Sequence, residues 1–201
     1  MKKRKKEAII IIILSIIFVI LTYLIFNNKL ITLDNITHSY IISIRNEKLT
    51  SIFKLITNLG SATCLIIINI FLFLLSKNKN TPKYLAIHLT IGILLNQLIK
   101  IIFTRPRPLN INIINISGYS YPSGHSMMSL ILYGYLIYLI HKSKLNQKLK
   151  LIIIIFLIIM ILLIGFSRIY LGVHYLTDVI GGFILASIYL LVAKNIKLEK
   201  K

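Results

Sequence analysis

Residues 8–26 read AIIIIILSIIFVILTYLIF, a stretch without a charged side chain that decides the class of this chain. The hydrocarbon core of a bilayer is about 30 Å thick, so a helix needs roughly 20 apolar residues to cross it. A soluble domain could not bury runs of this length, and 57% of the 201 residues are hydrophobic. The stretch therefore predicts a membrane-spanning helix in an integral membrane protein.

Further apolar segments of similar length follow along the chain. Backbone groups in hydrocarbon have no water to pair with, so each segment is expected to be helical. We therefore predict an all-α fold, a membrane bundle of six transmembrane helices that forms a single domain over residues 1–201. The predicted spans are 8–26, 56–76, 84–103, 124–141, 149–167 and 174–193.

The N-terminus also resembles a secretory signal peptide, because a basic head precedes apolar residues. The apolar stretch is longer than the apolar region of a signal peptide, and no small-x-small cleavage site follows it. We expect residues 8–26 to be retained as the first span.

The net charge of +19 would suit a nucleic-acid-binding protein, but the positions of the basic residues argue against that function. Lysines gather in short flanks beside the apolar runs, where Lys and Arg fix the orientation of spans. These clusters lie at 2–6, 76–83, 141–150 and 194–201. We expect the bilayer, and no nucleic acid, to be the partner of this charge.

The predicted orientation follows from the same residues. With six spans, both termini and the loops at 77–83 and 142–150 share one side, which holds most of the 24 Lys and Arg residues. Because cytoplasmic loops carry this excess, both termini are predicted to be cytoplasmic. The polar connection 27–55, with Asp34 and His38, would lie outside, and its intermittent apolar residues predict a short interfacial amphipathic helix.

Three polar segments interrupt the apolar runs, and all three fall on the predicted outer side. They are Lys100–Pro108, Tyr121–Ser126 and Ser167–Asp178. The first and third supply Lys100, Arg107 and Arg168 without a carboxylate for each, since the chain has only five acidic residues. Clustered cations with planar guanidinium donors suit a phosphate dianion.

The second segment adds a helix start. Ser123 is a good N-cap residue, and Gly124 lets the backbone approach a ligand closely. The fourth predicted span begins there, so free N–H groups and the helix dipole would face a bound phosphate. His125 is then expected beside that phosphate.

His174 and Asp178 are four residues apart, which predicts that they lie on one face of the sixth helix. A carboxylate in that position accepts a hydrogen bond from one imidazole nitrogen, so the other nitrogen presents its lone pair outward. A histidine held in this tautomer is a nucleophile or a base.

Each of these residues has an ordinary structural explanation when it is taken alone. Lys and Arg at span ends often extend to the interface, and a single histidine can simply be paired. Those explanations do not account for three polar segments on one predicted membrane face. No such support exists for four other residues, which we interpret as structural: His38, His88, His141 and Arg105.

The three segments read Lys-x6-Arg-Pro, Pro-Ser-Gly-His and Ser-Arg-x5-His-x3-Asp. This pattern resembles the type 2 phosphatidic acid phosphatase superfamily, which also includes bacterial undecaprenyl-diphosphate phosphatases and vanadium haloperoxidases. Every signature position is present between residues 100 and 178, and the six predicted spans extend the likeness over most of the chain.

The resemblance implies that His174 attacks phosphorus to form a phosphohistidine, that Asp178 orients His174, and that His125 is the general acid. It also implies the residues that bind the phosphoryl oxygens: Lys100, Arg107, Ser123, Gly124 and Arg168. Similar enzymes need no metal, and the sequence has no carboxylate cluster that would bind one. No cofactor is expected.

The leading interpretation is a metal-independent lipid phosphatase with its site on the outer face of the cell membrane. Undecaprenyl diphosphate is the first expected substrate, and phosphatidic acid and phosphatidylglycerophosphate are the alternatives. Vanadium haloperoxidases are typically soluble, which disfavours that activity. A non-catalytic protein that binds or transports an anion is the alternative from another class, but binding alone needs only the cations. The sequence does not fix the oligomeric state.

Overall fold

The computed structural model describes residues 2–195 of the chain, and this part is helical without strands. The helices of the described part are α1 (Lys2–Phe26), α2 (Ile31–Ser43), α3 (Glu47–Asn58), α4 (Ala62–Leu75), α5 (Asn80–Phe103), α6 (Gly124–Lys142), α7 (Gln147–Tyr170) and α8 (Leu176–Asn195). The all-α prediction is confirmed. Most of the basic cluster predicted at 194–201 lies outside the described residues.

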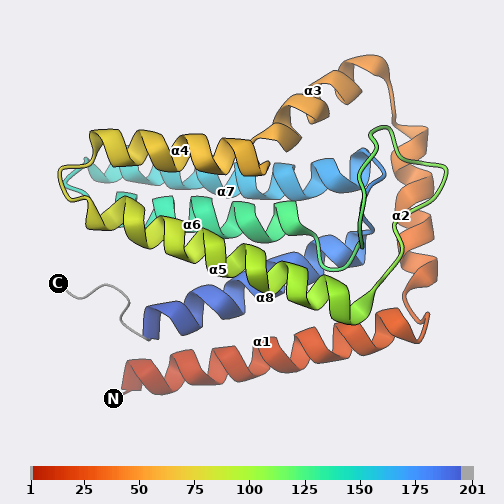
Figure 1. Cartoon of the computed structure of the whole chain (residues 1–201), viewed down its shortest axis with the longest axis horizontal. Coiled ribbons are helices and arrows are strands. Elements are labelled where there is room, and N and C mark those ends of the chain that lie inside the picture. The colour runs from red at the N-terminus through yellow and green to blue at the C-terminus, as the bar shows by residue number, and fades with distance from the viewer. Residues whose placement is uncertain (1, 196–201) are drawn as a thin grey trace.

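Helix α6 lies at the centre of the bundle, where it packs against α5, α7 and α8 (Figure 1). Its buried apolar side chains, among them Met127, Ile131 and Leu132, form the core together with Leu85 of α5 and Ile164 of α7. Helix α1 lies along α8, and α4 lies along α5. Helix α2 crosses the bundle at the end opposite to the start of α1 (Figure 1).

The outer surface of the bundle is apolar. Helix α7, for example, exposes Ile152, Phe156 and Ile159, and α1, α4 and α5 expose similar side chains. An exposed apolar surface of this extent marks contact with another apolar phase. The fold is that of a multi-pass membrane protein, whose outward-facing side chains meet lipid.

Four described helices are long and apolar enough to cross a membrane: Arg4–Phe26, Asn80–Phe103, Gln147–Tyr170 and Leu176–Lys194. A fifth crossing exists if the bent pair α3 and α4 is counted as one. Helix α6 does not reach this apolarity, because it carries serines and tyrosines that the surrounding helices shield from lipid. The number of six spans therefore stays a prediction.

The predicted span 56–76 is not one straight helix. Helix α3 ends at Asn58, and α4 begins after Ser61, whose side chain accepts a hydrogen bond from the Cys64 N–H. The two helices meet at an angle of 50°. Gly60 lies in this break, and a glycine followed by an N-cap serine ends one helix and starts the next.

The polar connection 27–55 forms two helices, where the sequence predicted one. Asp34, His38 and Ile41 are buried, and their helical spacing directs one face of α2 toward the bundle. Arg45, after α2, donates to the carbonyl oxygens of Ile111 and Tyr170. These contacts hold α2 against the loops that build the site described next.

Candidate active site

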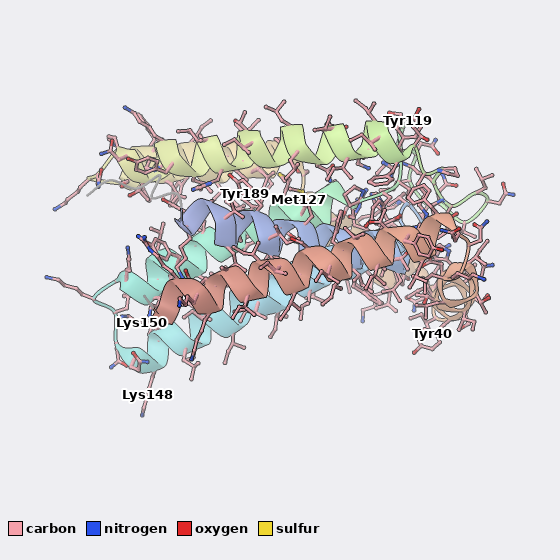
Figure 2. All side chains as sticks on the ribbon, turned by 90° about the horizontal axis from the view of Figure 1, so that it is seen from below. Tyr40, Tyr119, Met127, Lys148, Lys150 and Tyr189 are labelled. Atoms are coloured by element: carbon pink, nitrogen blue, oxygen red, sulfur yellow. The ribbon has the colours of Figure 1, made fainter. Side chains whose placement is uncertain are left out.

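The three polar segments meet at one end of the bundle. The loop 104–123 between α5 and α6 runs beside the turn 171–175 between α7 and α8 (Figure 1). The Ile113 N–H donates to the Leu171 carbonyl at 2.9 Å. In Figure 2, Tyr119 of the loop and Tyr40 of α2 lie at this end, whereas Lys148 and Lys150 lie at the other end.

Two glycines permit the close packing of these segments. Gly172 has a φ of +71°, and a Cβ there would lie 2.2 Å from the Ile111 carbonyl oxygen. A Cβ on Gly182 of α8 would lie 2.6 Å from the Ser123 carbonyl oxygen. The loop can therefore approach the turn 171–175, and the start of α6 can approach α8, only because no side chain intervenes.

His174 and Asp178 form the buried centre of the site. The Nδ1 atom of His174 lies 3.4 Å from Oδ2 of Asp178, and the two side chains are 2% and 0% exposed. The prediction that both residues lie on one helix is wrong, since His174 precedes the first residue of α8, Leu176. Asp178 accepts from the Tyr175 N–H at 2.9 Å, so the carboxylate caps the helix that the histidine was expected to join.

Further groups surround the Asp178 carboxylate. Ser120 donates to Oδ2 through its hydroxyl, and Arg105 donates to Oδ1 at 2.5 Å. Oδ2 therefore faces His174 while Oδ1 faces the guanidinium of Arg105. A buried carboxylate that accepts this many hydrogen bonds is fixed in orientation and remains charged.

Arg107 lies at the other nitrogen of the imidazole. Its Nη1 is 3.2 Å from Nε2 of His174 and donates to the Val173 carbonyl at 2.8 Å. Its Nε donates to the Gly118 carbonyl at 2.9 Å. The ring of His174 is thus held between a carboxylate at Nδ1 and a cation at Nε2.

Lys100 and Arg168 are buried cations of the same region. Lys100 donates to the carbonyl oxygens of Tyr119 and Ser120, and Arg168 donates to Thr57 Oγ1 at 2.6 Å. The Nε of Arg168 is buried without a hydrogen-bond acceptor. Within the described residues, no ion pair involves Lys100, Arg107 or Arg168, so their charge is available to an anion.

The start of α6 completes the arrangement. The Ser123 side chain is the N-cap and accepts from the Ser126 N–H, as the sequence predicts. Gly124 is the first residue of α6, and its Cα faces Asn96, whose Oδ1 would lie 3.0 Å from an added Cβ. His125 lies within electrostatic range of Arg168, His174, Arg107 and Lys100.

Burial and charge determine the protonation of the site. Burial lowers the pKa of His174 below its ordinary value of 6.5, against the opposing effect of the Asp178 carboxylate. The imidazole is therefore neutral near pH 7. With Asp178 at Nδ1, the proton resides on that nitrogen, and the lone pair of Nε2 faces the guanidinium of Arg107.

The structure brings together all the predicted site residues, and it adds residues that the sequence left out. The sequence favours a structural role for Arg105 and His38, yet Arg105 contacts Asp178 and His38 Nε2 lies 3.3 Å from the His174 carbonyl oxygen. Asp34 contacts Arg105, and Thr57 contacts Arg168. The only sequence signal for Asp34 and His38 was their i, i+4 spacing in a polar connection.

The donor set favours an anion over a metal ion. Within the part of the chain that the structure describes, no group of three or more His, Cys, Asp or Glu side chains is arranged to hold a metal. Cations and helix N-termini prevail instead, and both stabilise phosphate-like charge.

Comparison with known proteins identifies a family and two curated relatives. The sequence profile of the PAP2 superfamily matches residues 82–201. Phosphatidylglycerophosphatase B of Bacillus subtilis (strain 168) is 33% identical over 184 residues, which cover 89% of this chain and 90% of that protein. Undecaprenyl-diphosphatase BcrC of the same strain is 30% identical over 153 residues, which cover 73% of this chain and 74% of that protein.

Two crystal structures share the fold. A transmembrane PAP2-type phosphatidylglycerolphosphate phosphatase from Bacillus subtilis matches with a TM-score of 0.83 and 29% identity, over 94% of this chain and 98% of that chain. Aquifex aeolicus LpxE matches with a TM-score of 0.65 and 26% identity, over 79% of this chain and 92% of that chain.

Proposed function

The chain belongs to the PAP2 superfamily and is a lipid phosphatase of the membrane, and from this premise we propose that it hydrolyses its substrate through a phosphohistidine on His174. One observation carries the proposal. The imidazole of His174 lies between Asp178 and Arg107, beside the buried cations Lys100 and Arg168, which have no ion-pair partner among the described residues.

His174 is the nucleophile in the proposed first step. Asp178 holds the Nδ1 proton, and the Nε2 lone pair attacks phosphorus while the bond from phosphorus to the leaving oxygen breaks. The negative charge of the bound phosphate favours a protonated His125, which gives its proton to that leaving oxygen. The positive charge that forms on the imidazole of His174 is stabilised by the Asp178 carboxylate.

Hydrolysis of the intermediate reverses these roles. His125, now neutral, takes a proton from a water molecule, and the water oxygen attacks phosphorus. The P–N bond to His174 breaks, and inorganic phosphate leaves. The same histidine therefore serves as acid and then as base, as microscopic reversibility requires.

Cations and backbone amides bind the phosphoryl oxygens in this proposal. Lys100, Arg107 and Arg168 supply charge, and Ser123 and Gly124 lie at the N-terminus of α6, where N–H groups lack partners within the helix. Arg107 occupies the Nε2 side of His174. Phosphoryl oxygens would draw its guanidinium away from that nitrogen and expose the lone pair to phosphorus.

We further propose six crossings of the cell membrane, with the termini cytoplasmic and the site on the outer face. The charge distribution supports this orientation, since Lys148 and Lys150 lie at the end of the bundle opposite to the site (Figure 2). Helix α6 would cross the membrane at the centre of the bundle, where α5, α7 and α8 shield it from lipid, and would bring the number of spans to six. An interfacial site suits a substrate whose headgroup is polar and whose tails stay in the bilayer.

Phosphatidylglycerophosphate is the substrate that the comparisons favour. The relative named for that activity aligns over 89% of this chain, and a crystal structure of such a phosphatase matches with a TM-score of 0.83. Undecaprenyl diphosphate, the substrate expected from the sequence, is the second candidate because undecaprenyl-diphosphatase BcrC aligns over 73% of this chain. Neither reaction would need a metal ion at a site built from cations.

Phosphate release tests the proposal. The purified protein in detergent with EDTA is given phosphatidylglycerophosphate, undecaprenyl diphosphate and phosphatidic acid, with His174→Ala as the matched control. We expect the wild-type protein to release phosphate in the presence of EDTA, and to do so fastest with phosphatidylglycerophosphate. We expect no phosphate release by His174→Ala. Release that stops with EDTA would refute metal independence. Binding of the substrates without release by the folded wild type would indicate the non-catalytic alternative.

A further inference from the structure

Asp34 is a completely buried carboxylate that the proposed mechanism does not use. It comes from α2, yet it accepts from the Thr177 N–H at 3.1 Å and from the Thr177 hydroxyl at 2.7 Å. Asp34 therefore caps the first turn of α8 from another helix. A buried carboxylate is costly unless it is paired, and a cation lies beside it.

That cation is Arg105, which joins Asp34 to the site. Its Nη2 donates to Asp34 Oδ2 at 2.8 Å, and its Nη1 donates to Asp178 Oδ1 at 2.5 Å. The guanidinium also lies 4.1 Å from the ring centre of Tyr175. The planar fork of arginine spans two carboxylates in one fixed geometry, which the single ammonium of lysine cannot reproduce.

Arg105 bridges Asp34 and Asp178, and this bridge fixes the rotation of the Asp178 carboxylate. Arg105 holds Oδ1, so that Oδ2 is left to face Nδ1 of His174 at 3.4 Å. Without Arg105, Oδ1 would be buried without a donor, and only the donors at Oδ2, Ser120 and the Tyr175 N–H, would still hold the carboxylate. The orientation of the proposed nucleophile thus depends on a guanidinium that does not touch it.

The charges lead to the same conclusion. Arg105 alone would neutralise Asp178 and weaken its attraction for a positive imidazole. Asp34 compensates Arg105, so that the three groups together keep one negative charge next to His174. Interactions between charges are strong in a buried environment, where screening by water is weak.

We propose that Arg105 and Asp34 are a positioning pair, which orients Asp178 toward His174 and preserves the negative charge that His174 needs during phosphoryl transfer. Neither residue contacts the phosphate in this proposal. It rests on the proposed function, because phosphate release is its readout. The loss should therefore fall on kcat, while KM, which reports substrate binding, should stay near the wild-type value.

Two conservative variants test the pair. Arg105→Lys keeps the positive charge but removes the planar guanidinium that donates to two carboxylates at once. Asp34→Asn keeps the shape of the side chain but removes its negative charge. We expect each to lower kcat by roughly ten- to a hundredfold, as changes behind a catalytic group typically do, with KM nearly unchanged. Lys29→Ala, which removes an exposed cation between α1 and α2, is the control and should match the wild type.

The double variant Arg105→Lys/Asp34→Asn separates the pair from two independent structural effects. Residues that act as one unit are not additive, so the double variant should lose little more than the worse single variant. Thermal unfolding in detergent identifies any variant that is not folded, and the other single variant then decides. Single variants with wild-type kcat, or with a raised KM alone, would overturn the pair. A wild type without phosphate release would instead refute the proposed function.

Discussion

Arg168 Nη1 lies 2.6 Å from Thr57 Oγ1, so a cation at the end of α7 is held by the last turn of α3. This contact predicts the effect of Thr57→Val, which keeps the side-chain shape and removes the acceptor. A hydrogen bond to a charged group contributes about 1.5–3 kcal/mol. We expect kcat/KM for lipid phosphate to fall about tenfold or more. Thr57→Ser retains the hydroxyl and should keep most of the activity, and equal activity of both variants would contradict this role of Thr57.

Gly60 packs against the proposed general acid, and its replacement should disturb that residue. A Cβ at this position would lie 3.2 Å from Cδ2 of His125 and 2.6 Å from Cγ2 of Ile164. Gly60→Ala should lower kcat and destabilise the protein by about 1–3 kcal/mol, the usual cost of overpacking. Gly134→Ala in α6 is the control, since its Cβ would approach no closer than 3.4 Å. Thermal unfolding and phosphate release give the two readouts.

Gly172 and Gly118 form a matched pair for the packing of the two loops. Both have positive φ, but an added Cβ meets the Ile111 carbonyl oxygen at 2.2 Å in Gly172 and nothing within 4 Å in Gly118. Gly118→Ala should cost only the backbone strain, about 1–2 kcal/mol. Gly172→Ala should unfold at a clearly lower temperature and lose activity. Equal unfolding temperatures would show that the loops do not need this close contact.

The protonation of His174 gives a pH prediction. Burial lowers its pKa below 6.5, so the neutral, nucleophilic form persists as the pH falls through 6.5 and is lost only at lower pH. Histidine-selective NMR of the protein without substrate measures this directly, with the His174 signal assigned by its absence in His174→Asn. We expect no titration of that signal around pH 6.5. A midpoint at 6.5 would mean that the imidazole is not buried as described.

The sequence predicts much of the helical framework because long apolar runs admit few structures in a bilayer. The predicted spans 8–26, 84–103 and 149–167 fall within α1, α5 and α7. The break at Gly60 is harder to predict from the sequence, since a glycine within an apolar run is compatible with a straight helix. Gly60 and Ser61 permit a break without requiring one, and the 50° angle between α3 and α4 in the structure shows it.

The composition of the site was predictable, but its supporting contacts were not. Lys100, His125 and Arg168 lie in segments whose motif and polarity distinguish them from apolar surroundings. Asp34 and Arg105 lie far apart in sequence, and their ion pair depends on how α2 folds back on the loop after α5. Local patterns do not encode such long-range contacts, so neither the place of Arg105 in a polar segment nor the i, i+4 spacing of Asp34 and His38 predicted this ion pair.

A different limit explains the error at the start of α8, where one local pattern fits two local structures. The i, i+4 spacing of His174 and Asp178 fits one helix, yet it equally fits a turn followed by a capped helix. Tyr175 lies between them and donates its N–H to the Asp178 carboxylate. Because this N–H does not continue a helical hydrogen-bond ladder, the helix begins after Tyr175 and His174 lies outside it. The chemical pairing survived the error because both geometries bring the imidazole to the carboxylate.

Trapping of the phosphoenzyme shows whether His174 carries the phosphoryl group during turnover. Wild-type protein and His174→Ala are mixed with substrate labelled in the phosphoryl group, quenched in alkali within a turnover, and digested for mass spectrometry. We expect a base-stable, acid-labile phosphoryl group on the peptide that contains His174, and no labelled protein in the variant. Phosphate release by His174→Ala at the wild-type rate, or label on a different residue, would contradict it.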